Sequence, residues 1–203
     1  MKKYLIIVLL LVLAFPGVLQ AQKVALKTNV LYWATTTPNI GIEARIAPRF
    51  TFNIEGGYNP FTLNDDIEVN KKVKHFLVSP EIRYWFCESF NGHFIGVNGN
   101  YSQFNVGAVE IPEIFYSLSD PAGMVGMAKN ARSEGWAAGG GITYGYQWML
   151  GRRLNLEATI GLGYWYTEYD KFDNRKCGVF QQSFNKHLLG ITKCGLSFIY
   201  LLK

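Results

Sequence analysis

The chain has 203 residues and a formal net charge of +5, with 49% hydrophobic, 15% aromatic and only 17% charged residues. The basic excess is small and scattered, so nothing in it indicates nucleic acid as a partner. A soluble domain carries about 25% charged residues, so we expect part of this surface to contact something other than water.

The first 21 residues have the pattern of a secretory signal peptide. Lys2 and Lys3 follow the initial methionine, and an almost unbroken apolar run then continues to residue 18, shortly before Ala21. The run contains Pro16 and is shorter than the roughly 20 residues of a membrane-spanning helix. We therefore expect residues 1–21 to be removed and residues 22–203 to form one domain; an uncleaved anchor is the alternative.

Eight segments of the remaining chain alternate between apolar and small or polar residues, which is the period of a β-strand. They are residues 24–34, 39–46, 50–59, 76–86, 93–106, 135–148, 154–166 and 188–201. Apart from a brief first link at 35–38, short and long links alternate between them, as in bacterial barrels with tight periplasmic turns and larger external loops. The sequence therefore predicts an all-β fold, an eight-stranded antiparallel up-and-down transmembrane β-barrel with both termini in the periplasm.

One strand residue departs from this pattern. Pro80 lies inside the predicted strand 76–86, where proline removes a hydrogen bond of the ladder. A closed barrel has no free edge on which to place such a residue, so we expect a bulge there.

The apolar face could point outward to lipid, or inward to a ligand as in a secreted lipocalin-like barrel. The opposite face of residues 135–147 carries glycine and alanine without charge, which suits a crowded interior better than a surface in water. Trp136 and Trp148 lie on the apolar face 12 residues apart. At about 3.3 Å per residue and a strand tilt of about 40°, that is roughly 30 Å of height, and aromatic girdles flank a band of about 25 Å. We expect Trp136, Trp148, Tyr164 and Tyr84 to form such a girdle.

The end of the chain also favours lipid. Lys193, Gly195, Phe198 and Tyr200 have the spacing of polar, glycine and aromatic residues that resembles the C-terminal assembly signal of outer-membrane barrels. That signal is read by the barrel-insertion machinery as the last strand. Outer-membrane lipid and this machinery are therefore the expected partners.

The face opposite the lipid carries four acidic and four basic residues, which we expect to form a polar network in the lumen. An eight-stranded barrel is only just wide enough to be filled by its own side chains, and buried charges persist when they are paired. A plug is therefore expected, and a narrow transport channel, detectable by its conductance, is the alternative. The residues are Lys27, Glu43, Arg45, Glu55, Glu81, Arg83, Glu157 and Lys193.

The three cysteines do not have the spacing of a metal site or of a disulfide framework. Cys87 and Cys177 belong to opposite ends of the predicted barrel, and Cys194 to its lipid face. We expect all three to be free thiols, and we expect no metal or other cofactor.

Catalysis is considered because some outer-membrane barrels modify lipids with a serine and a histidine near the membrane rim. The candidates are His75, His187 and Ser183. Nucleophilic catalysis needs a base within hydrogen-bond reach of the nucleophile, and no such arrangement is marked in the sequence. We therefore expect no enzyme, with a lipid-modifying enzyme as the alternative.

Several short strings spread over the mature chain resemble a known family. They are residues 26–29 (LKTN), 34–39 (ATTTPN), 56–60 (GGYNP), 83–87 (RYWFC), 91–94 (NGHF), 134–136 (EGW), 144–147 (YGYQ) and 161–164 (GLGY). Together they resemble a family of small outer-membrane barrels of unknown function from gut and oral Gram-negative anaerobes. The resemblance implies the barrel and its location in the outer membrane, with some members near fimbrial or surface-assembly components, and it implies no catalytic residue.

The expected function is a non-enzymatic role in the cell envelope. Loops on a rigid scaffold are where binding usually resides, so the external loops are expected to bind a surface partner such as an adhesin or a pilus component. The longest predicted loop, residues 107–133, includes an apolar stretch at 111–118. That stretch is interpreted as a strand extension above the membrane or as a contact patch.

Overall fold

The computed structural model describes residues 24–34, 36–65, 70–107, 131–173 and 178–202. The predicted signal peptide, the apolar stretch 111–118 and Cys177 lie outside the described residues. Nearly all of the described chain is strand, and none of its helices is long and apolar enough to cross a bilayer. The elements are β1 (Val24–Asn29), α2 (Val30–Ala34), β2 (Asn39–Ala47), β3 (Phe50–Asn59), β4 (Thr62–Asp65), β5 (Asn70–Trp85), β6 (Gly92–Gly107), β7 (Ala131–Met149), β8 (Leu154–Asp173) and β9 (Phe180–Leu201).

Eight of the strands form a closed ring. Neighbouring strands pair antiparallel, β3 pairs with β5, and β9 pairs with β1 to complete the circle. The short strand β4 lies outside the circle and pairs only with the start of β5. The predicted all-β fold of eight antiparallel strands is therefore confirmed.

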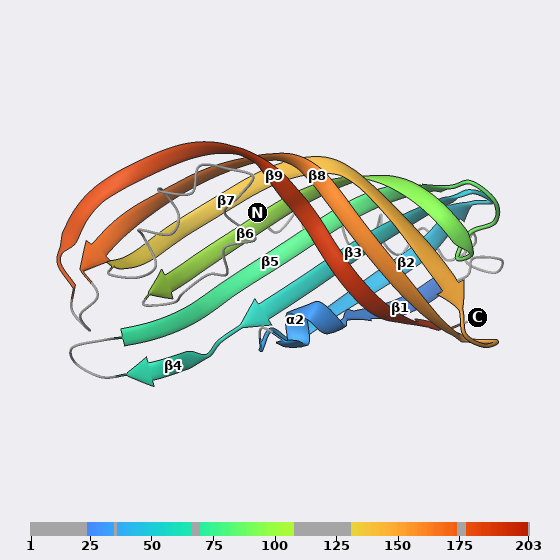
Figure 1. Ribbon diagram of the computed structural model, residues 1–203, viewed down its shortest axis with the longest axis horizontal. Coiled ribbons are helices and arrows are strands. Elements are labelled where there is room, and N and C mark those ends of the chain that lie inside the picture. The colour runs from blue at the N-terminus through green and yellow to red at the C-terminus, as the bar shows by residue number, and fades with distance from the viewer. Residues whose placement is uncertain (1–23, 35, 66–69, 108–130, 174–177, 203) are drawn as a thin grey trace, which may run out of the picture.

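The two ends of the ring differ, and we name them by their connections. At the turn end lie the short links 48–49, 86–91 and 150–153, together with the first and last described residues, since the Leu202 amide donates to the Val24 carbonyl at 2.8 Å. At the loop end, β5 to β9 continue well beyond the shorter β1, β2 and β3, as Figure 1 shows. The ring is therefore complete only toward the turn end.

The predicted first strand is too long. Strand β1 ends at Asn29, and Val30–Ala34 forms the single helical turn α2. The Asn29 side-chain oxygen accepts a hydrogen bond from the Leu31 amide at 3.1 Å, which is how an asparagine caps the start of a helix. The apolar residues of this turn continue the preceding strand pattern, so periodicity did not reveal the change.

Three predicted loops are shorter than expected because the flanking strands extend into them. Strand β5 begins at Asn70, β7 begins at Ala131, and the β8–β9 hairpin runs from Leu154 to Leu201 with its link at 174–179. These extensions contain charged and amide residues on both faces, which obscure the apolar alternation.

The bulge predicted at Pro80 is wrong. The pairing of β5 with β6 omits Ser79 and Pro80 but continues in the same register on both sides. Pro80 still faces Ile54 of β3, so the missing donor is accommodated by one interrupted step of the ladder. A shift of register occurs instead in β9, where Ile191 and Lys193 face consecutive residues of β8.

Side chains alternate between the interior and exterior of the ring. Large interior aromatics lie against glycines of β7: the Trp165 ring covers Gly139, and the Phe94 ring covers Gly145. A β-carbon at either glycine would stand within 3 Å of the ring. The glycine-rich face of β7 thus leaves room for aromatic side chains from its neighbours.

Candidate functional site

Seven ionisable side chains meet inside the ring, and we call them the charge network. They come from six strands: Lys27 (β1), Glu43 (β2), Glu55 (β3), Glu81 and Arg83 (β5), Glu157 (β8) and Lys193 (β9). All seven occupy inward positions of the strand alternation, where pairing with opposite charges offsets the cost of removing them from water.

Arg83 lies at the centre of the charge network. Its guanidinium contacts Glu81 at 2.8 Å, Glu157 at 2.8 Å and Glu43 at 3.0 Å, with no exposure of the arginine side chain. The guanidinium also lies 4.3 Å from the centroid of the Phe94 ring, a cation–π contact. One planar cation therefore joins carboxylates from three strands.

The two lysines flank this arginine. Lys27 donates to Glu43 at 2.7 Å and to Glu157 at 2.8 Å. Lys193 donates to Glu81 at 2.8 Å and to Glu55 at 2.9 Å. Each lysine bridges two carboxylates, so the network runs continuously across the interior.

Neutral side chains add further hydrogen bonds to the carboxylates. The Thr51 hydroxyl donates to Glu43 at 2.5 Å, and the Asn53 amide donates to Glu55 at 2.8 Å and to Glu81 at 3.2 Å. These neighbours belong to β3, the strand between Glu43 and Glu81. A buried charged cluster with this many shared hydrogen bonds favours one arrangement of the surrounding strands.

Seven of the eight residues that the sequence predicted for the lumen thus belong to one network. The eighth, Arg45, lies farther along β2 toward the turn end, and its side chain is half-buried. The seven residues of the charge network are three cations and four carboxylates.

Aromatic side chains close the interior below the charge network, and we call them the aromatic floor: Trp85, Phe90 and Phe94. All three are at most 2% exposed, and the Trp85 ring lies 6.0 Å from Phe90 and 4.7 Å from Phe94. Phe90 belongs to the β5–β6 turn, where its positive φ of 68° directs the chain back under the ring. The Trp85 indole N–H donates to Thr51 at 2.9 Å, which ties the floor to the network.

The sequence reading did not identify the aromatic floor. Trp85 has the same strand parity as Glu81 and Arg83, and this could have placed it in the interior. Phe90 carries no such signal because it lies in a turn, where alternation does not apply.

The closing seam between β1 and β9 depends on Asn29. Its side-chain amide donates to the Cys194 carbonyl at 3.2 Å, and its side-chain oxygen accepts from the Leu196 amide at 3.2 Å. The Asn39 side chain in turn accepts from the Asn29 amide at 2.6 Å and donates to the Asn29 carbonyl at 2.9 Å. Asparagine side chains thus take the place of strand backbone where β1 gives way to α2.

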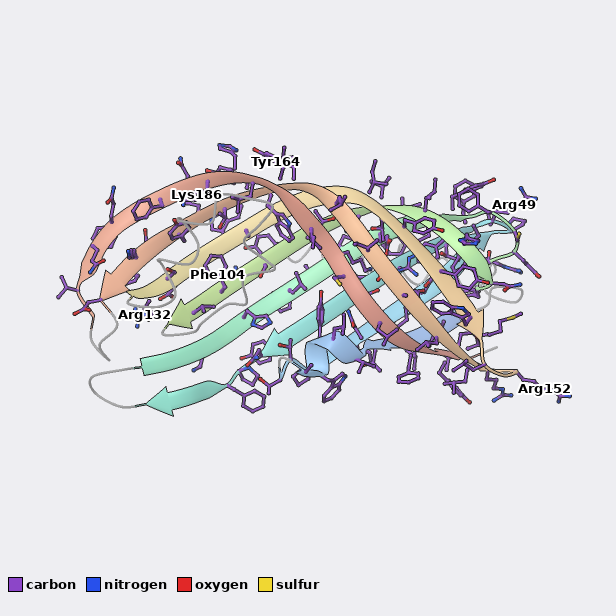
Figure 2. All side chains as sticks on the ribbon, viewed as in Figure 1. Arg49, Phe104, Arg132, Arg152, Tyr164 and Lys186 are labelled. Carbon is purple, nitrogen blue, oxygen red and sulfur yellow. The ribbon has the colours of Figure 1, made fainter. Side chains whose placement is uncertain are left out.

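The predicted aromatic and terminal residues lie on the expected sides of the wall. Tyr164, which points outward in Figure 2, and Trp148 are each 44% exposed, whereas Trp136 and Tyr84 are half-buried on the same outer face. Of the predicted assembly signal, Phe198 and Tyr200 face outward and Lys193 and Gly195 face inward. All four belong to β9.

The three candidate catalytic residues have separate hydrogen-bond partners. The Ser183 hydroxyl donates to Asp170 at 2.6 Å, His187 contacts the Tyr164 hydroxyl, and His75 contacts the Thr37 hydroxyl at 3.2 Å. Ser183 and His187 lie four positions apart on β9, and His75 lies on β5. No contact described for these residues joins the serine to either histidine.

Cys87 and Cys194 are exposed free thiols. Within the described ranges, no three histidine, cysteine or acidic residues are grouped as metal ligands.

The comparisons with known proteins identify a family without a described activity. No curated protein and no solved structure is significantly similar to the chain. Residues 6–202 match the model of a family described as a protein of unknown function (DUF3575), and the chain belongs to that family.

Proposed function

We propose that this chain is a small integral β-barrel protein of the outer membrane of a Gram-negative bacterium. Residues 22–203 form the mature barrel, both termini lie in the periplasm, and the loop end faces outward from the cell. Its role in the envelope is non-enzymatic, and its external part binds a surface partner such as an adhesin or a fimbrial component.

The observation that carries the membrane proposal is a belt of exposed aliphatic side chains around the outside of the ring. Ile142 is 68% exposed, and its neighbours Val97 and Leu162 are 67% and 57% exposed. A continuous apolar surface of this extent is unfavourable in water and suits hydrocarbon. The remaining members of the belt include Ile42, Ile54, Ile82 and Ile160.

Aromatic side chains border the belt on both sides. Trp148 lies toward the turn end, with Tyr146 at 4.8 Å between ring centroids. Toward the loop end, the centroid of the Trp136 ring lies 6.4 Å from that of Tyr101 and 5.5 Å from that of Tyr166. Amphipathic rings at two levels are typical of the two interfaces of a bilayer.

The polarity of the interior agrees with this orientation. The charge network is buried while the aliphatic belt is exposed, which is the reverse of a domain that folds in water. A lipocalin-like barrel would place its apolar face inward and its charges outward. The arrangement of Arg83 and Ile142, on opposite sides of one wall, therefore favours lipid outside.

A matched pair of substitutions tests the location. Ile142→Arg places a charge in the belt, and Val179→Arg places one at a residue that is 74% exposed beside the β8–β9 link. In phospholipid vesicles, Ile142→Arg is expected to lower the free energy of unfolding by about 2–4 kcal/mol, the cost of arginine at the bilayer midplane. Val179→Arg, outside the bilayer, is expected to leave it unchanged.

Equal effects of the two substitutions would contradict the proposal. The same holds if the purified mature chain is a monomer without detergent and retains a hydrophobic compound in its interior.

The family resemblance and the architecture support the proposal of a partner at the loop end. A rigid ring that carries extended strands at one end is a scaffold on which binding surfaces commonly reside.

A further inference from the structure

Strand β9 is much longer than the strand that closes the ring against it. Strand β1 pairs with β9 only from Ser197 to Leu201. Asn29 then supplies side-chain hydrogen bonds to Leu196 and Cys194. From Phe180 to Lys193, no strand in the described part of the chain pairs with this side of β9. We call this stretch the β9 edge; in Figure 1 it runs beyond α2 to the loop end.

Main-chain groups of alternate residues point toward this edge. The Leu196 amide faces β1, because it is bonded to Asn29, so Gly195 faces β8. Thr192 is an extra residue in β9, so the alternation of main-chain direction is reversed on its loop-end side. There the main-chain groups of Lys186 and Leu188 face β8, where these residues pair with Thr167 and Trp165. In an antiparallel ladder the intervening residues face the other way, so Asn185 and His187 direct their amides and carbonyls to the open side.

The side chains beside the edge have a definite pattern. Phe184, Lys186 and Leu188 face the interior and are half-buried, with Phe184 stacked on Tyr169 at 5.5 Å between ring centroids. Ser183, Asn185 and His187 face outward and are exposed. The inward side chains of a strand added here would lie against Phe184, Lys186 and Leu188. Its outward side chains would lie beside the polar residues of β9.

The geometry points to a strand-acceptor site: we propose that the β9 edge binds an extended segment of a separate partner protein by antiparallel strand addition. The inward positions of that segment carry apolar residues against Phe184 and Leu188 and an acidic residue near Lys186. Its outward positions are polar. This inference rests on the proposed function only for the statement that the edge faces outward from the cell.

An extended peptide fits the edge better than an acyl chain or a second copy of this chain does. A row of amides and carbonyls needs directional hydrogen-bond partners, which another strand supplies and an acyl chain does not. A second copy of this chain would offer the same edge. Between Phe180 and Thr192 that edge contains Lys186 and no acidic residue, so self-pairing would leave the lysine without a complementary charge.

The probe is a fluorescent peptide of seven residues. Threonine occupies its first, third, fifth and seventh positions, and valine, glutamate and valine occupy the second, fourth and sixth. Its binding to the full mature chain in detergent micelles is measured by anisotropy, for the unmodified protein and for Asn185→Pro and Asn185→Ala. Proline removes an edge amide that has no ladder partner, so the fold is retained; alanine keeps that amide. Saturable binding is expected for the unmodified chain and Asn185→Ala, and about tenfold weaker binding for Asn185→Pro, the equivalent of one or two main-chain hydrogen bonds.

A second arm does not depend on a protein variant. Replacing the central glutamate of the peptide by glutamine is expected to weaken binding, and replacing a central threonine by proline is expected to abolish it. Hydrogen exchange at the amides of Asn185 and His187 is expected to slow when the unmodified peptide binds.

Several results would overturn the strand-acceptor site. One is that the peptide does not bind the unmodified chain. Another is that the peptide binds Asn185→Pro as tightly as the unmodified chain. A mature chain whose mass in micelles is dimeric, and becomes monomeric in Asn185→Pro, would identify a second copy as the occupant instead. None of these results alters the comparison of Ile142→Arg with Val179→Arg, so failure of this inference is distinguishable from failure of the membrane proposal.

Discussion

The turn end and the loop end of the ring are built from the same strands but are stabilised differently. At the turn end all eight strands are paired, and the interior holds the charge network above the aromatic floor. At the loop end only β5 to β9 and the short β4 continue, and interior residues such as Phe184 are half-buried. The closed end therefore has more paired backbone and a more deeply buried interior, so we expect it to unfold last.

The largest effect is expected at the centre of the charge network. Arg83→Met removes the cation shared by Glu43, Glu81 and Glu157 while keeping much of the side-chain volume. Breaking a buried pair in this way is expected to lower the free energy of unfolding by about 3–5 kcal/mol, because buried carboxylates are left unpaired. The measurement is urea denaturation of the chain in vesicles.

The matched control for this change is Arg152→Met, in the exposed β7–β8 turn. It is expected to change stability by no more than about 0.5 kcal/mol. A similar loss for both variants would mean that the network does not set the stability of the turn end.

A pair of phenylalanines tests the two ends directly. Phe90→Ala removes a side chain that is 2% exposed from the aromatic floor, with an expected loss of about 3 kcal/mol from the cavity. Phe184→Ala removes a half-buried ring that stacks on Tyr169, with an expected loss of about 1 kcal/mol. Both are measured by the same denaturation assay, and a larger loss for Phe184→Ala would reverse the comparison.

A smaller loss than that of Phe90→Ala is expected at the seam. Asn29→Ala leaves the Leu196 amide and the Cys194 carbonyl without their partner and uncaps α2, with an expected loss of about 2 kcal/mol. Asn29→Asp keeps the acceptor but buries a carboxylate at a residue that is 3% exposed and turns one of its oxygens toward the Cys194 carbonyl, so a larger loss than that of Asn29→Ala is expected. Unfolding in urea distinguishes the two, and a smaller loss for Asn29→Asp would show that the acceptor outweighs the buried charge.

The features that follow strand periodicity could be predicted from the sequence. Alternation located the eight ring strands, and parity placed Lys27, Glu81 and Lys193 on the same inner face. The narrow interior then required these charges to be paired, although strand stagger, and hence each partner, could not be determined without the registers.

The features set by local hydrogen bonding could not be predicted in the same way. Helix α2 continues the apolar run of β1, and only the contacts of Asn29 and Asn39 show why the strand stops. Phe90 enters the interior from a turn, and the loop-end extensions of β8 and β9 are polar. At Pro80, periodicity suggested a bulge, whereas the β5–β6 ladder is interrupted without a change of register.

The placement of the two lysines has a consequence for the order of assembly. Lys27 lies on the first strand and Lys193 on the last, and each reaches carboxylates on other strands. While the sheet is still open between these strands, Lys27 can reach Glu43 on the neighbouring β2, but its contact with Glu157 and both contacts of Lys193 join strands far apart in the open sheet. The last part of the charge neutralisation therefore coincides with circular closure, which makes the final docking of the chain ends cooperative.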